Sequence, residues 1–273
     1  MLHKRYFIGL LLGLILSPLV QAQSTSFFQI VIDRTGSMDQ IRQSTGNTRY
    51  QDAITQAQSD LGKAIAEAAA QGGILKVAVA AFESNTGFDK RLDFSDPLDA
   101  MTELDSLKSL PTGNMTPLAD ALCHSADELF TQSSVNPYQR NIGFYTDLNE
   151  NQSSGECSGS DWTAKVIQKF FSGFPAPVFN VTMFATIDEL TQSSINTFNL
   201  RKALAKNESK AIVENSLFKT ANAIANIQDE VTFMTSLAQY SGGSTLGFAD
   251  AVEDPVLDSG DSDCGIFFPC IAK

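Results

Sequence analysis

Three segments of the sequence carry oxygen-bearing side chains of the kinds that bind metal ions. The first directly follows the short apolar run 27–32, the second stands at the expected start of a helix, and the third directly follows the apolar run 141–146. Together they supply two carboxylates and three hydroxyls, an all-oxygen set that suits a hard divalent cation. The five predicted metal ligands are Asp33, Thr35, Ser37, Thr116 and Asp147.

This combination of ligands would also leave the metal open to a partner molecule. Two carboxylates neutralise the charge of a divalent cation, and neutral hydroxyls add ligands without binding it too tightly. A carboxylate from another protein could then compete for a vacant coordination position. Mg²⁺ is the expected ion, with Mn²⁺ and Ca²⁺ as alternatives.

The segments that position these ligands alternate between strand and helix patterns. Short runs rich in β-branched and apolar residues indicate buried strands, and apolar residues at helical spacing indicate amphipathic helices. The expected strands cover 27–32, 74–82, 141–146, 178–185 and 245–248, with 90–94 as a short antiparallel edge strand. The expected helices cover 50–70, 97–110, a segment starting with Thr116 as N-cap and Pro117 as first helical residue, 161–171 and 228–240.

This alternation predicts an α/β fold of the doubly wound kind. Its central sheet should be mostly parallel with one antiparallel edge strand, and helices should cover both faces. In such sheets ligands bind at the carboxyl ends of the strands. The three ligand-bearing segments are expected at that edge, each at a strand end or a helix start.

The spacing of the five ligands resembles the metal-ion-dependent adhesion site (MIDAS) of von Willebrand factor A (vWA) domains. The Asp-x-Ser-x-Ser motif of that family corresponds to Asp33, Thr35 and Ser37, with threonine in place of the first serine. The separate threonine of the family corresponds to Thr116, and its distal aspartate to Asp147. The glycine that often follows this aspartate is Leu148 here. The similarity extends over about residues 27–250.

The resemblance implies a metal-dependent protein-binding module rather than an enzyme. In the family, an acidic residue of a partner protein completes the coordination of the metal. Residues around the site would then set specificity, and Trp162 is either an exposed anchor or part of a half-buried helix start. The candidates are Arg34, Asp39, Asn114, Asn149, Glu150 and Trp162.

The first 22 residues resemble an export signal. Lys4 and Arg5 precede an apolar run that is too short to span a bilayer comfortably, and cleavage is expected after Ala22. A retained membrane anchor is the alternative. The predicted location is therefore periplasmic or secreted. The formal net charge of −12 argues against a nucleic-acid partner and favours cations.

The rest of the chain divides into one domain and a tail. The vWA-like domain should cover residues 23–250, with 187–227 as an extended helical insertion. Residues 251–273 form an acidic tail that contains two cysteines. No second apolar run has the length of a membrane span.

Four cysteines in an exported chain suggest two disulfide bonds. The preferred pairs are Cys123 with Cys157 and Cys264 with Cys270, although four cysteines allow three pairings. A buried free thiol at Cys123 and a zinc site are the alternatives. A Cys123–Cys157 bridge would brace the helix after Thr116 against the loop after Asp147.

Enzymatic functions fit the sequence poorly. Once residues 1–22 are removed, one histidine remains, and adjacent helical residues such as Cys123 and His124 point about 100° apart. No phosphate-binding loop or dinucleotide motif is present. The main alternative is a structural subunit of a bacterial envelope assembly, in which 187–227 makes the contacts and the metal mainly stabilises the fold. A metal-assisted hydrolase is a third hypothesis.

Overall fold

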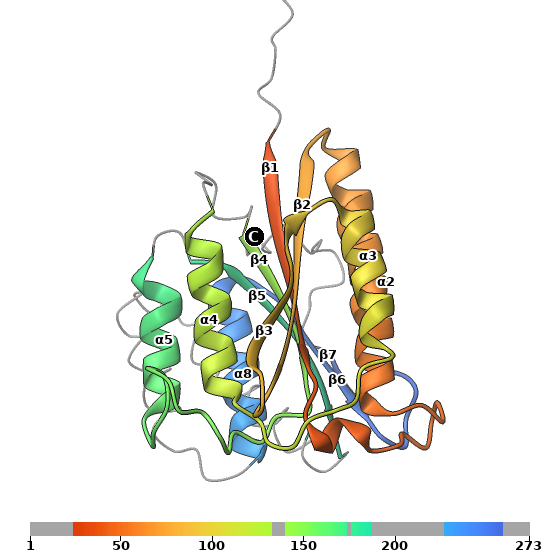
Figure 1. Cartoon of the computed structure of the whole chain (residues 1–273), viewed down its shortest axis with the longest axis vertical. Coiled ribbons are helices and arrows are strands. Elements are labelled where there is room, and N and C mark those ends of the chain that lie inside the picture. The colour runs from red at the N-terminus through yellow and green to blue at the C-terminus, as the bar shows by residue number, and fades with distance from the viewer. Residues whose placement is uncertain (1–23, 133–139, 174–175, 187–189, 191–226, 259–273) are drawn as a thin grey trace, which may run out of the picture.

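A seven-stranded sheet forms the centre of the molecule, with strand order β3-β2-β1-β4-β5-β6-β7 (Figure 1). The computed structural model describes residues 24–132, 140–173, 176–186, 190 and 227–258. The strands are β1 (Thr25–Asp33), β2 (Ile74–Glu83), β3 (Gly87–Ser95), β4 (Arg140–Thr146), β5 (Val178–Ala185), β6 (Thr245–Ala249) and β7 (Leu257–Asp258). The described helices are the 3₁₀-helix η1 (Gly36–Asp39) and the α-helices α2 (Arg49–Ala70), α3 (Pro97–Leu107), α4 (Leu118–Phe130), α5 (Trp162–Ser172) and α8 (Ile227–Ser241).

The strand pairing confirms the predicted α/β fold class. Strands β2, β1, β4, β5 and β6 are parallel to one another, and β3 pairs with β2 in antiparallel orientation at one edge. The two-residue strand β7 adds a second antiparallel pair at the other edge, which the sequence did not suggest. Strand order reverses at β1, the arrangement of a doubly wound sheet.

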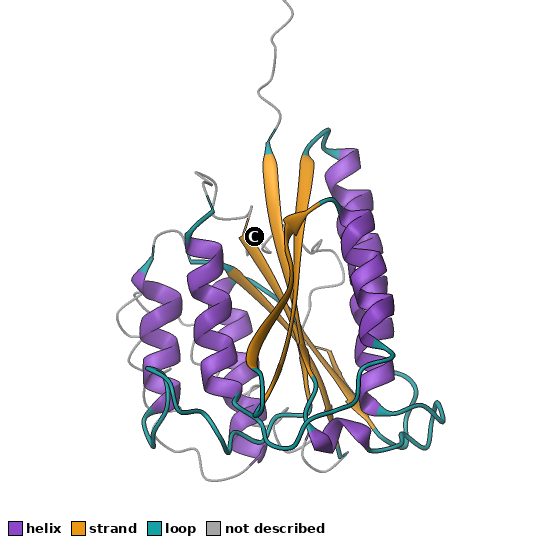
Figure 2. Ribbon diagram, viewed as in Figure 1, coloured by secondary structure: helices purple, strands orange, loops and turns teal. Residues whose placement is uncertain are grey.

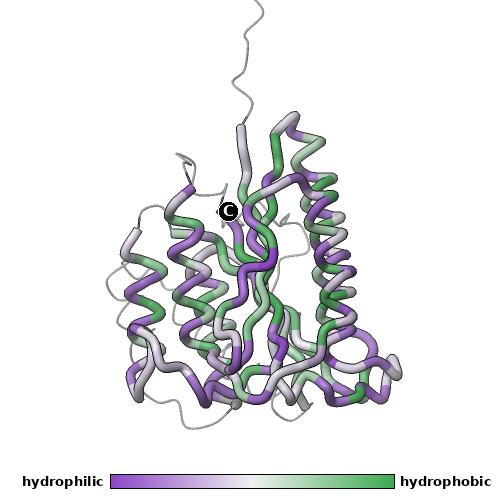
Figure 3. The backbone as a smooth tube through the Cα atoms, in the orientation of Figure 1, coloured by the Kyte–Doolittle hydropathy of each residue, from purple (hydrophilic) through white to green (hydrophobic). Residues whose placement is uncertain are grey.

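Helices cover both faces of the sheet and bury two separate apolar cores. One core packs α2 and α3 against side chains such as Ile30, Ile32 and Val79. The other packs α4, α5 and α8 against Val31, Phe144 and their neighbours on the opposite face. Successive strand residues alternate between the two cores because side chains point to opposite faces of a sheet. Figure 3 shows the matching alternation of apolar and polar residues along the helices.

Local capping explains where several helices begin. The Thr48 side chain accepts a hydrogen bond from the Gln51 backbone amide, and the Gln51 side chain accepts one from the Thr48 amide. This reciprocal capping box fixes the start of α2. At the start of α3 the Asp96 side chain accepts a hydrogen bond from the Leu98 amide, ahead of a proline at the first helical position.

The predicted N-cap of the fourth α-helix is wrong by one residue. Pro117 is the N-cap of α4, and its first helical residue is Leu118. The first turn is capped instead by the loop after β4: the Ala119 amide donates to Glu150 Oε2 at 2.6 Å, and the Asp120 amide donates to Ser153 Oγ at 3.0 Å. Because these side chains satisfy the helix amides, the Thr116 hydroxyl is not used for capping.

Several predictions lie outside the described residues. These are the signal peptide 1–22, nearly all of the insertion 187–227 and the Cys264–Cys270 pair. The domain limits also stay a prediction, although Leu257 and Asp258 beyond position 250 pair with β6. Within the part of the chain that the structure describes, no helix is long and apolar enough to cross a membrane.

Candidate metal centre

The predicted ligands gather at the carboxyl end of the sheet, where β1 and β4 lie side by side. Asp33 is the last residue of β1, and Asp147 directly follows β4. These neighbouring strands flank the point at which the strand order reverses, the usual ligand-binding position in such sheets. Figure 2 shows the loops that follow these strands together at the lower edge of the molecule.

A chain of hydrogen bonds connects four of the predicted ligands. The Thr35 amide donates to Asp33 Oδ1 at 3.0 Å, and the Thr35 and Ser37 hydroxyl oxygens lie 3.3 Å apart. Ser37 Oγ in turn donates to Asp147 Oδ1 at 2.9 Å. Thr146 Oγ1 donates to the other oxygen of Asp33 at 2.6 Å. Both carboxylates are therefore held in fixed orientations.

The loop that precedes Thr116 lies against the first ligand segment. The Gly113 amide donates to the Arg34 carbonyl at 2.6 Å, and the Gly36 amide donates to the Asn114 carbonyl at 3.4 Å. A Cβ atom on Gly113 would lie 2.1 Å from Glu83 Oε2, so a larger residue would push the loop away. Glycine is therefore required for this close approach.

Thr116 belongs to the same group of loops, although it is not hydrogen-bonded to the other four ligands. Its amide donates to Asn151 Oδ1 at 2.9 Å, and its carbonyl accepts from the Asn151 amide at 3.1 Å. This reciprocal pair ties Thr116 to the loop that follows Asp147. The residue is buried, and its hydroxyl makes no hydrogen bond with the described part of the chain.

The two carboxylates are buried and repel each other. Burial, followed by repulsion from Asp147, raises the pKa of Asp33 well above its usual value. Burial also raises the pKa of Asp147, although Arg49 and the Ser37 hydroxyl oppose this shift. Two buried acids in one site are costly as a charged pair unless a cation is close to them.

Arg49, the first residue of α2, contributes positive charge beside the site. Its guanidinium donates to Asp147 Oδ2 at 3.0 Å and to Asp250 through two further hydrogen bonds of 2.9 and 2.5 Å. All three side chains are largely buried. Arg49 therefore neutralises part of the acidic charge and leaves Asp33 without a basic partner among the described residues.

The donor set fits a hard divalent cation. The Thr35 amide joins the Asp33 carboxylate to a group that contains the hydroxyls of Thr35 and Ser37 and the carboxylate of Asp147. Carboxylate and hydroxyl oxygens are the ligands that Mg²⁺ and Ca²⁺ prefer. No cluster of three or more Asp, Glu, His or Cys side chains that could hold a metal occurs in the described ranges. A site here would therefore depend on hydroxyls in addition to its two carboxylates.

The turn after Asp147 has an unusual backbone. Leu148 and Asn149 have φ angles of 71° and 74°, in the left-handed region that favours glycine. Leu148 thus occupies the position where related sites often have glycine, and its side chain is fully buried in the core. The turn is held by Glu230 of α8, which accepts hydrogen bonds from the Asn149 and Glu150 amides at 2.6 and 3.1 Å.

The candidate specificity residues fall into two groups. Asp39, Asn114 and Asn149 are exposed around the site. Arg34 is buried instead, where it donates to the Pro111 carbonyl and pairs with Glu83. It therefore supports the loop and does not face solvent.

Two further candidates also have internal roles. Trp162 is 8% exposed and packs edge-on against Phe233, with ring centroids 5.2 Å apart, so it is part of the core. Glu150 caps α4 and accepts the Ser153 amide and hydroxyl. Both side chains therefore have structural roles within the fold.

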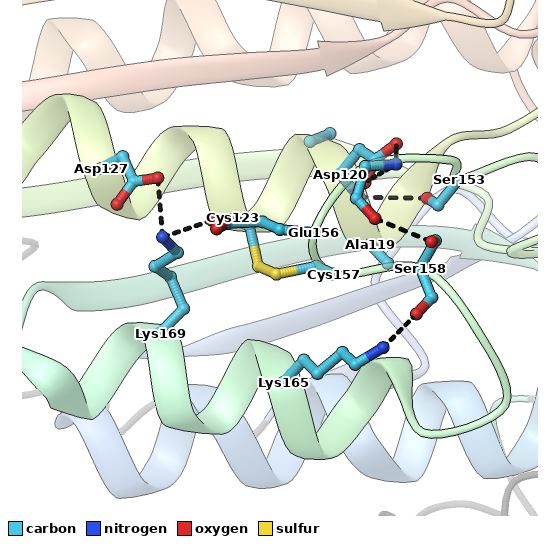
Figure 4. The surroundings of a disulfide bond; sticks show 12 residues. Ala119, Asp120, Cys123, Asp127, Ser153, Glu156, Cys157, Ser158, Lys165 and Lys169 are labelled. Atoms are coloured by element: carbon cyan, nitrogen blue, oxygen red, sulfur yellow. Dashed lines mark hydrogen bonds and ion pairs between the residues drawn. A yellow bond between two sulfur atoms is a disulfide. The ribbon is translucent and has the colours of Figure 1, made fainter.

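The preferred Cys123–Cys157 disulfide is present, with 6.5 Å between the Cα atoms (Figure 4). It joins the second turn of α4 to the loop after β4. Asp120 strengthens the same connection, because its carboxylate accepts from the Ser154 and Gly155 amides. The bond removes the free thiol at Cys123 and braces two ligand-bearing segments against each other.

Three charged side chains near the predicted ligands were not predicted from the sequence: Arg49, Glu230 and Asp250. Arg49 meets Asp250 across 201 positions of sequence, and Glu230 meets Asn149 across 81. Asp250 follows a short strand directly, as Asp33 and Asp147 do, and this shared position was a usable signal. Arg49 and Glu230 lie in the first turns of helices, where the sequence pattern does not distinguish them from solvent-exposed charges.

The comparisons with known proteins give structural matches. No protein-family model matches this sequence, and no curated protein does. The chain is similar to the conserved hypothetical protein BatB from Bacteroides thetaiotaomicron, with 16% identity, 60% of this chain and 68% of that chain covered, and a TM-score of 0.41. It is similar to the VWA domain of SpRpn10, with 9% identity, 78% and 97% covered, and a TM-score of 0.42.

A third similar structure is a mutant of the PilB minor pilin from Streptococcus sanguinis. The identity is 12%, the TM-score is 0.46, and the match covers 82% of this chain. The chain spans 61% of the length of that pilin. Independently of these matches, the strand order and the antiparallel β3 edge agree with the fold that the resemblance implies. The chain has the doubly wound, mostly parallel α/β fold with an antiparallel edge that the resemblance to vWA domains implies.

Proposed function

We propose that this protein is an exported vWA-type domain that binds a divalent cation and uses it to hold a protein partner. The observation that supports this most directly is the pair of buried carboxylates, Asp33 and Asp147, at the ends of adjacent strands. The Thr35 amide, which donates to Asp33, and the hydroxyls of Thr35 and Ser37 connect them. Asp33 has no basic partner among the described residues, and a divalent cation would balance its charge.

The proposed ligand set is Asp33, Thr35, Ser37, Thr116 and Asp147, with Mg²⁺ as the expected ion. The Thr116 hydroxyl, which makes no hydrogen bond with the described residues, is available to a ligand in this scheme. When bound, the cation would act as a Lewis acid toward an incoming carboxylate. The chain itself orients the ligand oxygens: Asp33, Thr35, Thr116 and Asp147 are buried, whereas Ser37 is exposed. Exposed Asp39, Asn114 and Asn149 would contact the partner around the metal.

The Cys123–Cys157 disulfide supports a location outside the cytoplasm, because disulfides persist in oxidising compartments. A periplasmic or secreted protein, released by cleavage after Ala22, is the location that we propose. The contacts that would favour an envelope-assembly subunit fall on 187–227, which lie almost entirely outside the described residues.

Cation binding is testable by equilibrium unfolding with and without Mg²⁺ or Mn²⁺. A cation present at one hundred times its dissociation constant should raise the free energy of unfolding by about 2.7 kcal/mol. Asp33→Asn should abolish this increase, because it removes one of the two carboxylates. The same variant should remain folded without metal, since it relieves the repulsion from Asp147 and keeps an oxygen for the Thr35 amide.

Asp93→Asn is the matched control, because Asp93 is an exposed acid of β3 that pairs with Lys90. It makes the same change in charge and should leave the response to the cation intact. An equal loss of response in both variants would contradict the proposed site.

Partner capture from an extract should then require the cation and fail for Thr116→Ala. Capture that survives both chelation and this substitution would exclude metal-dependent adhesion.

A further inference from the structure

Asp250 makes no hydrogen bond to any of the five predicted ligands, yet it shares a buried guanidinium with one of them. Arg49 binds Asp147 through one nitrogen and Asp250 through the other two. The three groups form a continuous line from the end of β4, through the start of α2, to the residue after β6. Side chains that bind one buried guanidinium from two directions affect each other energetically.

The loop between the first ligand segment and α2 makes several hydrogen bonds to the turn after β6. The Arg42 guanidinium donates to the carbonyls of Ala249 and Val252 at 3.0 and 2.8 Å. The Ser44 amide donates to the Asp250 carbonyl at 3.1 Å. Arg42 also lies over the rings of Phe184 and Phe248, which anchors it to the sheet.

A second connection runs through η1. Gln40 follows η1 directly, and its side chain donates to Asp250 Oδ2 at 3.1 Å, while its amide donates to the Ser37 carbonyl at 3.1 Å. Ser37 itself donates to Asp147. The path Asp147, Ser37, Gln40, Asp250, Arg49 and back to Asp147 is therefore a closed ring that includes two predicted metal ligands.

We infer that Asp250 is a positioning residue for the cation site and that Arg49 couples this site to the turn 249–252. With Asp250 in place, the positive charge of Arg49 is shared between two carboxylates. Without Asp250, Arg49 interacts with Asp147 alone, and its positive charge competes with the cation for that carboxylate. Because such coupling is reciprocal, any movement of the turn that separates Asp250 from Arg49 lowers cation affinity, and cation binding favours the fixed turn.

The part of this inference that concerns cations rests on the proposed metal site. Mn²⁺ binding to the full chain, measured by titration calorimetry, tests it directly. Asp250→Asn should weaken Mn²⁺ binding by at least about fivefold. Adding Arg49→Met should recover most of this loss, because it removes the competing charge. Asp254→Asn, at an exposed acid of the same segment, is the control and should change the affinity by less than about twofold.

A measurement without metal tests whether Arg49 couples Asp147 to Asp250. Asp147→Asn and Asp250→Asn should be non-additive by at least about fivefold in the unfolding equilibrium constant, and additive once Arg49 is replaced by Met. The inference is overturned by additivity within about twofold in the Arg49 background, or by unchanged Mn²⁺ affinity in Asp250→Asn. If the unaltered chain binds no cation, the proposed function fails. The mutant cycle still shows whether Arg49 couples Asp147 to Asp250.

Discussion

At the scale of single residues, Leu148 shows how the site combines two conflicting demands. Its backbone takes a left-handed conformation that a glycine would adopt without strain, while its side chain is fully buried. The conformation turns the chain immediately after Asp147 and presents two amides to Glu230. We interpret Leu148 as a residue that retains its packing in the core and accepts a strained backbone conformation in return.

This interpretation predicts that alanine destabilises the protein more than glycine at position 148, the reverse of the order in a helix. Leu148→Ala and Leu148→Gly both lose the buried side chain, at a cost of roughly 2–5 kcal/mol. Glycine should nevertheless be less destabilising than alanine by about 1 kcal/mol, because it relieves the strained φ angle. Urea unfolding of the two variants gives the comparison.

Leu122, which is equally buried but lies within α4, provides the control. There glycine should be worse than alanine by about 1 kcal/mol, as in any helix interior. The same order at both positions would show that the turn after Asp147 is not strained.

At the scale of elements, the loop after β4 is as important to the site as the strand itself. It supplies the caps of α4 through Glu150 and Ser153, holds Thr116 through Asn151, and carries Cys157. Lys169 of α5 pairs with both Asp127 of α4 and Glu156 of the loop, which adds an exposed connection (Figure 4). One loop thus positions the second and third ligand segments together.

The disulfide should make a large contribution to this arrangement. Replacing both Cys123 and Cys157 by alanine opens a loop that spans 34 positions, and the chain-entropy estimate for such a loop is about 3 to 4 kcal/mol. Urea unfolding of the double variant measures the loss. A loss below about 1 kcal/mol would mean that the hydrogen bonds of Glu150 and Asp120 hold the loop without the covalent bond.

At the scale of the whole molecule, the site is assembled from both halves of the sheet. Helix α8 contributes Glu230 to the turn after β4, and the residue after β6 contributes Asp250 to Arg49. Burial raises the pKa of Glu230 to about 7, and the two backbone amides only partly oppose this shift. The charged form of Glu230 is therefore disfavoured in the folded state.

This shift predicts a pH dependence of stability. Since the folded pKa lies above the ordinary value of 4.5, the folded state binds more protons than the unfolded state between about pH 4.5 and 7. Stability attributable to Glu230 should be fully present below that window and fall as the pH rises through it. Glu230→Gln should remove this contribution, worth on the order of 3 kcal/mol at most.

Urea unfolding of Glu230→Gln and of the unaltered chain, from pH 5 to 8 with a chelator present, tests this prediction. The glutamine variant should gain relative stability as the pH rises. Glu253→Gln, at an exposed position, changes the charge equally and should show no such trend. A constant difference between Glu230→Gln and the unaltered chain across the range would contradict the prediction.

The sequence by itself determined most of the helices and strands and the candidate ligands. Apolar runs such as 74–82 and helical spacing in 50–70 depend on local burial patterns, and these agree with β2 and α2 to within a residue or two. Asp33, Thr35, Ser37 and Asp147 were found from where strands end, and Thr116 from where a helix begins. Local pattern could not place the start of α4, because its cap comes from Glu150, far along the chain.

The tertiary structure alone decided how the charges of the site are arranged. Arg49 could have been an exposed residue of an amphipathic helix, and Asp250 could have been the first residue of a polar tail. Packing brings them together beside Asp147 because the order of the parallel strands places the end of β4 and the turn after β6 near the start of α2. Contacts across 98 and 201 positions arise from sheet order, which no short-range periodicity encodes.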